Sequence, residues 1–250
     1  MVNFVGIKMI TMKVSISKKV NITSVNQWFN VAPPEGGVSQ WRPGRSAMEM
    51  ARFALSDGFP VFISEELKRC GIRESYLECE PEALTPFPSE MGINGPRHHD
   101  LLMLGKNVVV GIEAKVSESF DKRIGDKKKG ATDNMKTRLK TSLEYIYGDN
   151  VPEHSDELFY QLFSATIGTL EEAKKRDKKK AVVLFVTFVG DVSKEKDYDN
   201  NVRTNNEAFK SFCQTLGLDE KGGKLSSVPG AEGIECWIRK IDVNVGSYSF

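Results

Sequence analysis

The longest amphipathic pattern in the chain lies between Asp156 and Arg176. Its apolar side chains Phe159, Phe163 and Ile167 recur every four residues, which is the spacing of one face of an α-helix. The acidic start and the basic end of the segment both complement the helix dipole. We therefore predict a long buried helix over residues 156–176.

Two other segments have patterns typical of strands. Ala181–Val189 is a continuous run of β-branched and aromatic residues, as expected for a central strand covered on both faces. In Val108–Val116 one alternating set of residues is wholly apolar, whereas the other set includes Glu113 and Lys115. Residues 98–104 precede this strand across a short turn, so we predict a β-hairpin.

Shorter signals of capping, turns and periodicity predict the remaining elements. They are helices over residues 23–29, 46–56, 64–69 and 205–216, and strands over 75–84 and 234–245. Ser46 and Glu49 fit the capping-box pattern at the start of the second of these helices. Residues 117–140 are rich in charge and glycine and are expected to form a surface excursion, partly helical. Residues 2–16 are expected to be a strand or a mobile lead-in.

The turn of the hairpin decides whether its charged side chains meet. With Gly105-Lys106 as a two-residue turn, Asp100 lies opposite Gly111, on the same face as Glu113 and one diagonal away. A three-residue turn would put the two carboxylates on opposite faces, so a shared site requires a two- or four-residue turn, or a bulge. Two converging carboxylates repel unless a cation lies between them, and such oxygen ligands suit Mg²⁺ or Mn²⁺.

Lys115 gives this pair of carboxylates a specific chemistry. A divalent ion lowers the pKa of a bound water and withdraws charge from a phosphoryl oxygen, while an ammonium orients the nucleophile and offsets charge in the transition state. Asp100, Glu113 and Lys115 therefore predict a metal-dependent site for phosphodiester hydrolysis.

Composition mainly excludes classes of protein. The chain has 250 residues, of which 40% are hydrophobic and 28% charged, a balance typical of one water-soluble globular domain. No run approaches the roughly 20 apolar residues of a membrane span and no signal peptide is recognised, so we expect a cytoplasmic protein. The four cysteines form no C-x-x-C pair and are expected to be reduced structural thiols.

Net charge gives little indication of a partner. It is +1, so any affinity for nucleic acid must come from local basic clusters. The runs Lys127-Lys128-Lys129 and Lys178-Lys179-Lys180 could contact phosphates, although such runs are more often solvated loops.

His99-Asp100 followed by Glu113-Ala114-Lys115 resembles the signature of the PD-(D/E)xK nuclease superfamily, with His99 where the namesake proline often stands. The resemblance implies an α/β fold with a restriction-endonuclease-like three-layer core, in which a central mixed β-sheet is flanked by helices in the order α-β-β-β-α-β. It also implies that Asp100, Glu113 and the Ala114 carbonyl bind Mg²⁺ or Mn²⁺.

Three further stretches are similar to a little-characterised bacterial branch of these nucleases: Trp41-x-x-Gly44-Arg45-Ser46-Ala47-x-Glu49, Ile112–Val116 and Tyr160-Gln161-Leu162. The resemblance implies a single nuclease-like domain over residues 1–250, with its core at about 41–190 and unassigned N- and C-terminal elaborations. It implies catalytic roles for Glu49 and Gln161. Alternatively, Glu49 only caps its helix and Gln161 only hydrogen-bonds within the first turn.

Three neighbours of the motif have open roles. His98 and His99 could touch metal or phosphate, but strand alternation sends only one of them to a given face, so one is structural. Glu82 follows Pro81 on the preceding strand and is expected to be exposed rather than directed into the site.

The main hypothesis is a divalent-metal-dependent nuclease acting on DNA. One alternative is a catalytically inactive nuclease-fold module that binds nucleic acid or a protein partner. Another is an enzyme acting on a different phosphate-containing small molecule, since fold does not fix substrate. The motif is equally compatible with DNA or RNA, with endo- or exonuclease action, and with a monomer or a homodimer.

Overall fold

The sheet at the centre of the protein is mixed. A computed structural model of the chain describes residues 10–16, 19–88, 95–116, 118–191 and 198–247. These residues form one eight-stranded sheet with the order β2-β1-β3-β4-β5-β6-β8-β7, in which β3, β4 and β5 are an antiparallel meander and β5, β6 and β8 are parallel. The strands are β1 (Thr11–Ile16), β2 (Val20–Asn21), β3 (Tyr76–Thr85), β4 (Arg97–Leu104), β5 (Val108–Lys115), β6 (Lys180–Val189), β7 (Gly222–Lys224) and β8 (Glu235–Asn244).

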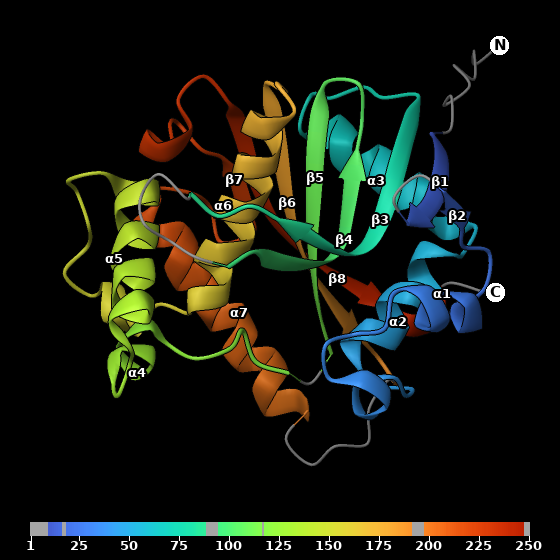
Figure 1. Cartoon of the computed structure of the whole chain (residues 1–250), viewed down its shortest axis with the longest axis horizontal. Coiled ribbons are helices and arrows are strands. Elements are labelled where there is room, and N and C mark those ends of the chain that lie inside the picture. The colour runs from blue at the N-terminus through green and yellow to red at the C-terminus, as the bar shows by residue number, and fades with distance from the viewer. Residues whose placement is uncertain (1–9, 17–18, 89–94, 117, 192–197, 248–250) are drawn as a thin grey trace, which may run out of the picture.

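Helices cover both faces of this sheet, so the described residues form three layers (Figure 1). One face carries α1 (Val25–Val31), α2 (Ser46–Ala54) and α3 (Gly58–Arg69), and the other carries α4 (Ile124–Lys128), α5 (Asp133–Tyr147), α6 (Tyr160–Lys175) and α7 (Tyr198–Thr215). The mixed α/β class predicted from the sequence is therefore confirmed. A single domain over residues 1–250 stays a prediction. Among the described residues, no helix combines the length and the apolar content needed to cross a membrane.

The two central strands follow their sequence patterns. Val108, Val110 and Ile112 of β5 pack in the core beneath α1–α3, whereas Val109 packs in the core beneath α6. In β6 every residue from Ala181 to Phe188 is buried. Both predictions, the two-faced strand and the fully covered strand, are confirmed.

Several element boundaries differ from the predictions. α6 begins at Tyr160 and not near Asp156, because Ser155–Glu157 form a separate 3₁₀ turn. α3 starts at Gly58 instead of Ser64, with Pro60 in the first helical turn, where its missing N–H costs nothing. The predicted helix 205–216 likewise starts earlier, at Tyr198. At the N-terminus, β1 confirms a strand over 11–16, while residues 2–9 lie outside the described part of the chain.

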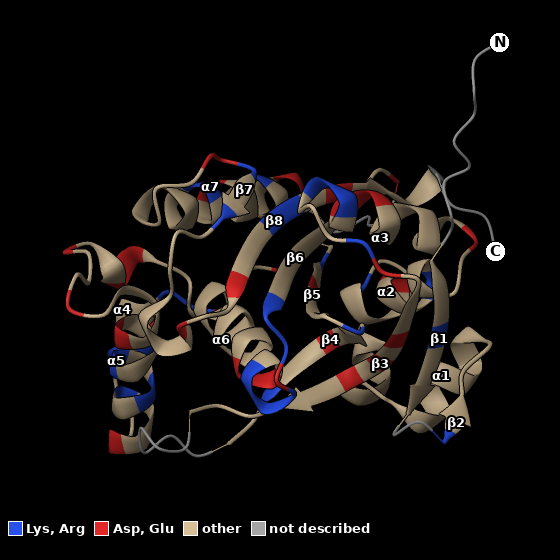
Figure 2. Cartoon of the chain, turned by 90° about the horizontal axis from the view of Figure 1, so that it is seen from above, with Lys and Arg blue, Asp and Glu red and all other residues tan. Residues whose placement is uncertain are grey.

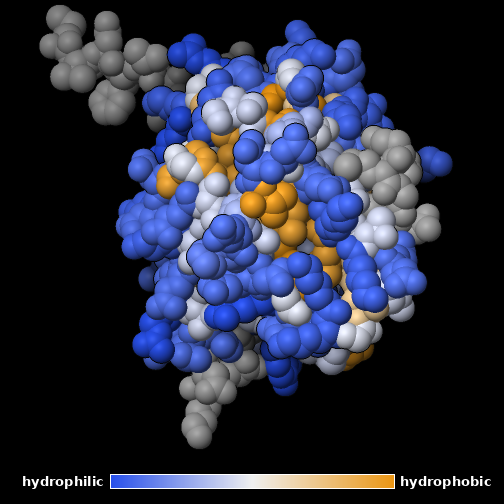
Figure 3. Space-filling model, turned by 90° about the vertical axis from the view of Figure 1, so that its left-hand side faces the viewer, coloured by the Kyte–Doolittle hydropathy of each residue, from blue (hydrophilic) through white to orange (hydrophobic). Residues whose placement is uncertain are grey.

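The charged segment after β5 is partly helical, as predicted, and it leads into α5, whose second half is largely buried. α5 has 15 residues and is N-capped by Thr132, whose hydroxyl accepts a hydrogen bond from the Met135 N–H. Its inner side buries Leu139, Leu143 and Ile146, and this side of the molecule presents a mostly hydrophilic surface (Figure 3). Most of the buried residues of α5 follow Lys140 and so lie beyond the 117–140 segment that was predicted to be a surface excursion.

The cysteines are structural, as predicted. Cys70, Cys79, Cys213 and Cys236 are all buried with free thiols. Burial raises the pKa of Cys79 to about 12, so this thiol stays protonated and unreactive near neutral pH.

The start of α2 is capped from a distant segment and not by a local capping box. The Glu118 carboxylate, which follows β5, accepts hydrogen bonds from the Ser46 N–H at 3.2 Å and from the Val116 N–H at 2.9 Å. Glu49 instead accepts from the Gly44 N–H. The predicted Ser46–Glu49 capping box is wrong, because Ser46 is the first helical residue and Arg45 occupies the N-cap. The contact ties α2 to the end of β5.

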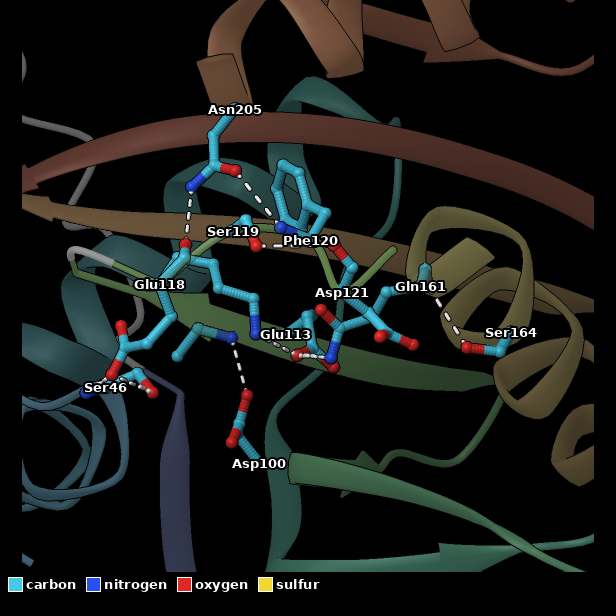
Figure 4. A network of polar contacts seen from close by, with 12 residues as sticks. Ser46, Asp100, Glu113, Glu118, Ser119, Phe120, Asp121, Gln161, Ser164 and Asn205 are labelled. Atoms are coloured by element: carbon cyan, nitrogen blue, oxygen red, sulfur yellow. Dashed lines mark hydrogen bonds and ion pairs between the residues drawn. The ribbon is translucent and has the colours of Figure 1, made fainter. Parts of the chain in front are cut away.

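Asn205 of α7 fixes the segment that follows β5 (Figure 4). Its amide is fully buried, donates to the Glu118 carbonyl at 2.8 Å and accepts from the Phe120 N–H at 3.2 Å. Replacing Asn205 by Ala should destabilise the protein by about 2–3 kcal/mol, because it leaves two backbone groups without partners. Chemical denaturation measures this loss.

The neighbouring exposed residue Asn206 provides the control. Asn206→Ala should change the free energy of unfolding by less than about 0.5 kcal/mol. Equal stabilities of the two variants would contradict a structural role for the Asn205 amide.

Candidate active site

The hairpin that carries the motif has a four-residue turn. Leu104 pairs with Val109 and Leu101 with Ile112, and the Gly105 N–H donates to the Val108 carbonyl at 2.9 Å. The two-residue turn is therefore wrong, and the four-residue alternative is the one found. Extending this register by one residue places Asp100 directly opposite Glu113, which keeps both carboxylates on one side of the hairpin.

β4 leaves β5 at Asp100. Its pairing with β5 stops at Leu101, whereas its pairing with β3 continues to Arg97. At the point of separation Asp100 Oδ2 accepts a hydrogen bond from the Ala114 N–H at 2.7 Å (Figure 4). The N–H and C=O of one strand residue point to the same neighbour, so the Ala114 carbonyl is also directed towards the edge that β4 vacates.

Glu113 receives three donors. Its Oε1 accepts from Lys115 Nζ at 2.7 Å and from Gln161 Nε2 at 2.5 Å, and its Oε2 accepts from Arg97. Glu113 and Lys115 are both buried, and Gln161 is the second residue of α6. The structure thus brings four of the predicted residues together, Asp100, Glu113, Lys115 and Gln161, and adds Arg97, which the sequence analysis missed.

Glu82 also lies at this site, so the prediction that it is merely exposed is wrong. It is half-buried in β3, and the β3–β4 register places it opposite Asp100. Its backbone has φ = 47°, a left-handed conformation that residues other than glycine rarely adopt. Glu82, Asp100 and Glu113 therefore form a row across three adjacent strands.

The alternation of strand faces breaks at the same level. Leu101 and Met103 pack in the core beneath α1–α3, so His99 should share their face, yet its ring lies against Gly111 and Gly168 beneath α6. His99 is fully buried, with its Nε2 3.0 Å from Thr85 Oγ1, and burial lowers its pKa. His99 is thus the structural member of the histidine pair, while His98 is exposed.

Crowded carboxylates set the electrostatics of the site. Burial and the charge of Glu113 raise the pKa of Asp100 to about 7. Burial and the charges of Asp100 and Glu113 raise the pKa of Glu82 to about 8. Burial alone lowers the pKa of Lys115, but the charges of Glu113 and Asp100 outweigh it, and the net shift is upward. Lys115 is therefore a stable cation at neutral pH.

These shifts give metal-free protein a defined pH dependence. A carboxyl whose pKa is raised on folding stabilises the folded state below its unfolded pKa, and this stabilisation is lost as the pH rises through its folded pKa. Asp100→Asn should therefore raise the melting temperature at about pH 8, with the gain vanishing towards about pH 4. A variant that melts below wild type at both pH values would contradict the raised pKa.

The residues surround a cavity of about 440 Å³. Its lining residues from the strands are Glu82, Arg97, His98, His99, Asp100, Glu113 and Lys115, joined by Gln161 and by residues of the 34–47 segment. The volume lies in the range of small-ligand sites. The described residues that line it include four carboxylates, those of Glu35, Glu82, Asp100 and Glu113, and two cations, Arg97 and Lys115. Along the ribbon in Figure 2, Lys/Arg and Asp/Glu positions are interspersed.

Glu49 does not line this cavity. Its buried Oε1 accepts from the Gly44 N–H and from Arg52 Nη1, both at 3.0 Å. Glu49 therefore holds the segment before α2 without capping the helix, and a catalytic role for it stays a prediction.

Arg138 of α5 links the segments that deliver two of the donors to Glu113. Its guanidinium donates to the Tyr160 hydroxyl at 2.6 Å and to the Pro96 carbonyl at 3.3 Å, and it lies 4.1 Å above the Phe87 ring. Tyr160 precedes Gln161 and Pro96 precedes Arg97 in the sequence. α5, which begins within the segment predicted to be a surface excursion, therefore helps to hold the site together.

The basic runs have neighbours of opposite charge. Lys127, Lys128 and Lys129 pair with Asp121, Asp156 and Asp126. In the second run Lys179 pairs with Asp177. Contact of either run with phosphate stays the less favoured of the two interpretations.

The donor set of the cavity fits a hard divalent cation. Asp100, Glu113 and the Ala114 carbonyl supply oxygen only. Burial, together with the charges of the neighbouring carboxylates, raises the pKa values of Asp100 and Glu82, and a bound cation would offset the cost of ionising these groups. Within the described ranges, no three His, Cys, Asp or Glu side chains are placed to hold a metal ion together. Mg²⁺ needs only one or two protein carboxylates, because water completes its coordination.

Comparison with known proteins assigns a family without a function. A family model described as a domain of unknown function (DUF6946) matches residues 21–244. No curated protein and no solved structure matches the chain.

Proposed function

The chain belongs to the DUF6946 family, a domain of unknown function, and we propose from its candidate active site that it is a divalent-metal-dependent phosphodiester hydrolase, a nuclease with DNA as its expected substrate. The observation that carries the proposal is the meeting of Asp100 and Glu113 at the point where β4 leaves β5, with Lys115 2.7 Å from Glu113. Buried like charges are costly unless they serve a site.

The order of elements supports the same proposal. α2, the β3–β4–β5 meander, α6 and β6 follow one another in the α-β-β-β-α-β order of the PD-(D/E)xK core, with α3, α4 and α5 inserted. We propose that these elements form a restriction-endonuclease-like core and that the signature residues have the roles that the family resemblance implies.

In the proposed reaction each residue has a separate task. Asp100, Glu113 and the Ala114 carbonyl would hold Mg²⁺ or Mn²⁺, which supplies Lewis acidity towards a phosphoryl oxygen and acidifies water. Lys115 orients the attacking water and offsets the charge that develops on the phosphate. Gln161 keeps the Glu113 carboxylate in position through its 2.5 Å hydrogen bond.

Metal titration and cleavage assays test the proposal together. Mg²⁺ and Mn²⁺ are titrated by calorimetry into wild type and into Asp100→Ala/Glu113→Ala, and both proteins are incubated with single- and double-stranded DNA, RNA and small phosphodiesters. We expect wild type to bind metal and cleave DNA, and the double variant to do neither. Equal behaviour of the two proteins would mean that the motif is structural, and the proposal would be wrong.

Two observations favour other functions, and the same assay distinguishes them from the nuclease. The cavity has the size of a small-ligand site, and its lining residues carry more carboxylates than cations, which favours a phosphate-containing small molecule. Cleavage of the small phosphodiesters alone would identify this case. Protein donors occupy both oxygens of Glu113, which favours an inactive binding module; nucleic-acid binding without metal binding or cleavage would identify that one.

A further inference from the structure

We propose that Arg97 is an additional catalytic residue, which leaves Glu113 when the cation binds and then binds the phosphate of the substrate. This inference rests on the proposed function of the same site.

Arg97 already lies in the cavity, and one of its guanidinium N–H donors has no hydrogen-bond partner among the described residues. It is the first residue of β4, its side chain is only 13% exposed, and it lines the cavity beside Asp100 and Glu113. One guanidinium nitrogen donates to Glu113 Oε2. Its Nε is buried and has no hydrogen-bond partner among the described residues. An unmet buried donor is costly, so the site favours an acceptor that the described residues do not provide.

The guanidinium and a metal ion compete for one carboxylate. Lys115 and Gln161 occupy Glu113 Oε1, and Arg97 holds Oε2, so a cation reaches Glu113 most directly by replacing Arg97. The Arg97 backbone stays paired with Thr85 in the β3–β4 ladder, and Arg138 holds the preceding Pro96 carbonyl. The released guanidinium therefore remains in the cavity.

A phosphate is the acceptor that suits this guanidinium. Its planar donors match phosphate oxygens in a bidentate geometry, which the Lys115 ammonium cannot reproduce. Arg97 and Lys115 would then divide the work: Lys115 remains beside Glu113 and the attacking water, while Arg97 neutralises the non-bridging oxygens.

The test uses Arg97→Met, Arg97→Lys and the control Arg176→Met in the full chain. Arg176 also pairs with a buried carboxylate, Glu172, but lies at the far end of α6, outside the cavity. Calorimetry measures Mn²⁺ affinity, and an oligonucleotide assay gives kcat and KM. Thermal unfolding verifies that each variant is folded, and Arg97→Lys keeps a cation in place if Arg97→Met does not fold.

Removal of the competing guanidinium should tighten Mn²⁺ binding about tenfold, while kcat falls about 100-fold or more with a smaller change in KM. Arg97→Lys should lie between wild type and Arg97→Met in both quantities, and Arg176→Met should match wild type. Weaker Mn²⁺ binding in Arg97→Met, or an unchanged kcat, would overturn the role of Arg97 alone. Absence of Mn²⁺ binding and of cleavage in wild type would overturn the proposed function as well.

Discussion

Lys115→Met should slow cleavage by about 10²–10³-fold while the protein still binds Mn²⁺. Loss of a positioned charge that stabilises the transition state lowers kcat by about 10²–10³-fold, whereas the metal-binding oxygens of Asp100, Glu113 and Ala114 remain. The metal-free variant should also be less stable by about 1.5–3 kcal/mol, because the hydrogen bond from Lys115 Nζ to the buried Glu113 carboxylate is lost. Cleavage kinetics, calorimetry and chemical denaturation measure the three effects.

Lys140→Met is the matched control for this substitution. The Lys140 side chain is 76% exposed on α5 and pairs with Glu144 at 3.6 Å, and such an exposed pair contributes little to stability. Its cleavage rate and stability should equal those of wild type. If Lys115→Met cleaves as fast as Lys140→Met, the ammonium has no role in the reaction and the proposed mechanism is wrong.

The main strands of the sheet could be predicted because the faces that a strand buries determine which of its positions are apolar. Ala181–Val189 and Val108–Val116 are covered on one or both faces, and their apolar positions follow directly from that. The start of α6 could not be predicted in the same way. Phe159 is apolar at helical spacing with Phe163, yet its ψ of 125° is extended. The apolar periodicity therefore begins before the first residue of the helix.

Prediction of the site succeeded where it depended on one strand and failed where it depended on contacts between strands. Glu113 and Lys115 share a face by alternation alone. Placing Glu82 beside Asp100 requires the β3–β4 register and the left-handed backbone conformation at Glu82. No sequence pattern specifies that register, and no glycine marks the left-handed position. Arg97 could have been suspected, since it stands three residues before Asp100, but nothing in the sequence pairs it with Glu113.

The close packing of α6 on the hairpin leads to the second large effect, at Gly168. A Cβ added there would lie 2.5 Å from Thr85 Oγ1, 2.8 Å from His99 Nε2 and 2.9 Å from Arg97 Cγ. Alanine favours a helix over glycine by roughly 0.5–1 kcal/mol, but overpacking of this kind costs about 1–3 kcal/mol. Gly168→Ala should therefore destabilise the protein in urea denaturation.

The same substitution should also reduce cleavage, because relief of the clash moves α6 away from the hairpin and takes Gln161 from Glu113. Gly223→Ala is the matched control: its added Cβ would meet only Leu218 Cδ2, at 3.4 Å, an ordinary contact, so its free energy of unfolding should change by less than about 0.5 kcal/mol. If Gly168→Ala were instead more stable than wild type, helix propensity would outweigh packing at this position, and the glycine would not be what allows α6 to approach the site.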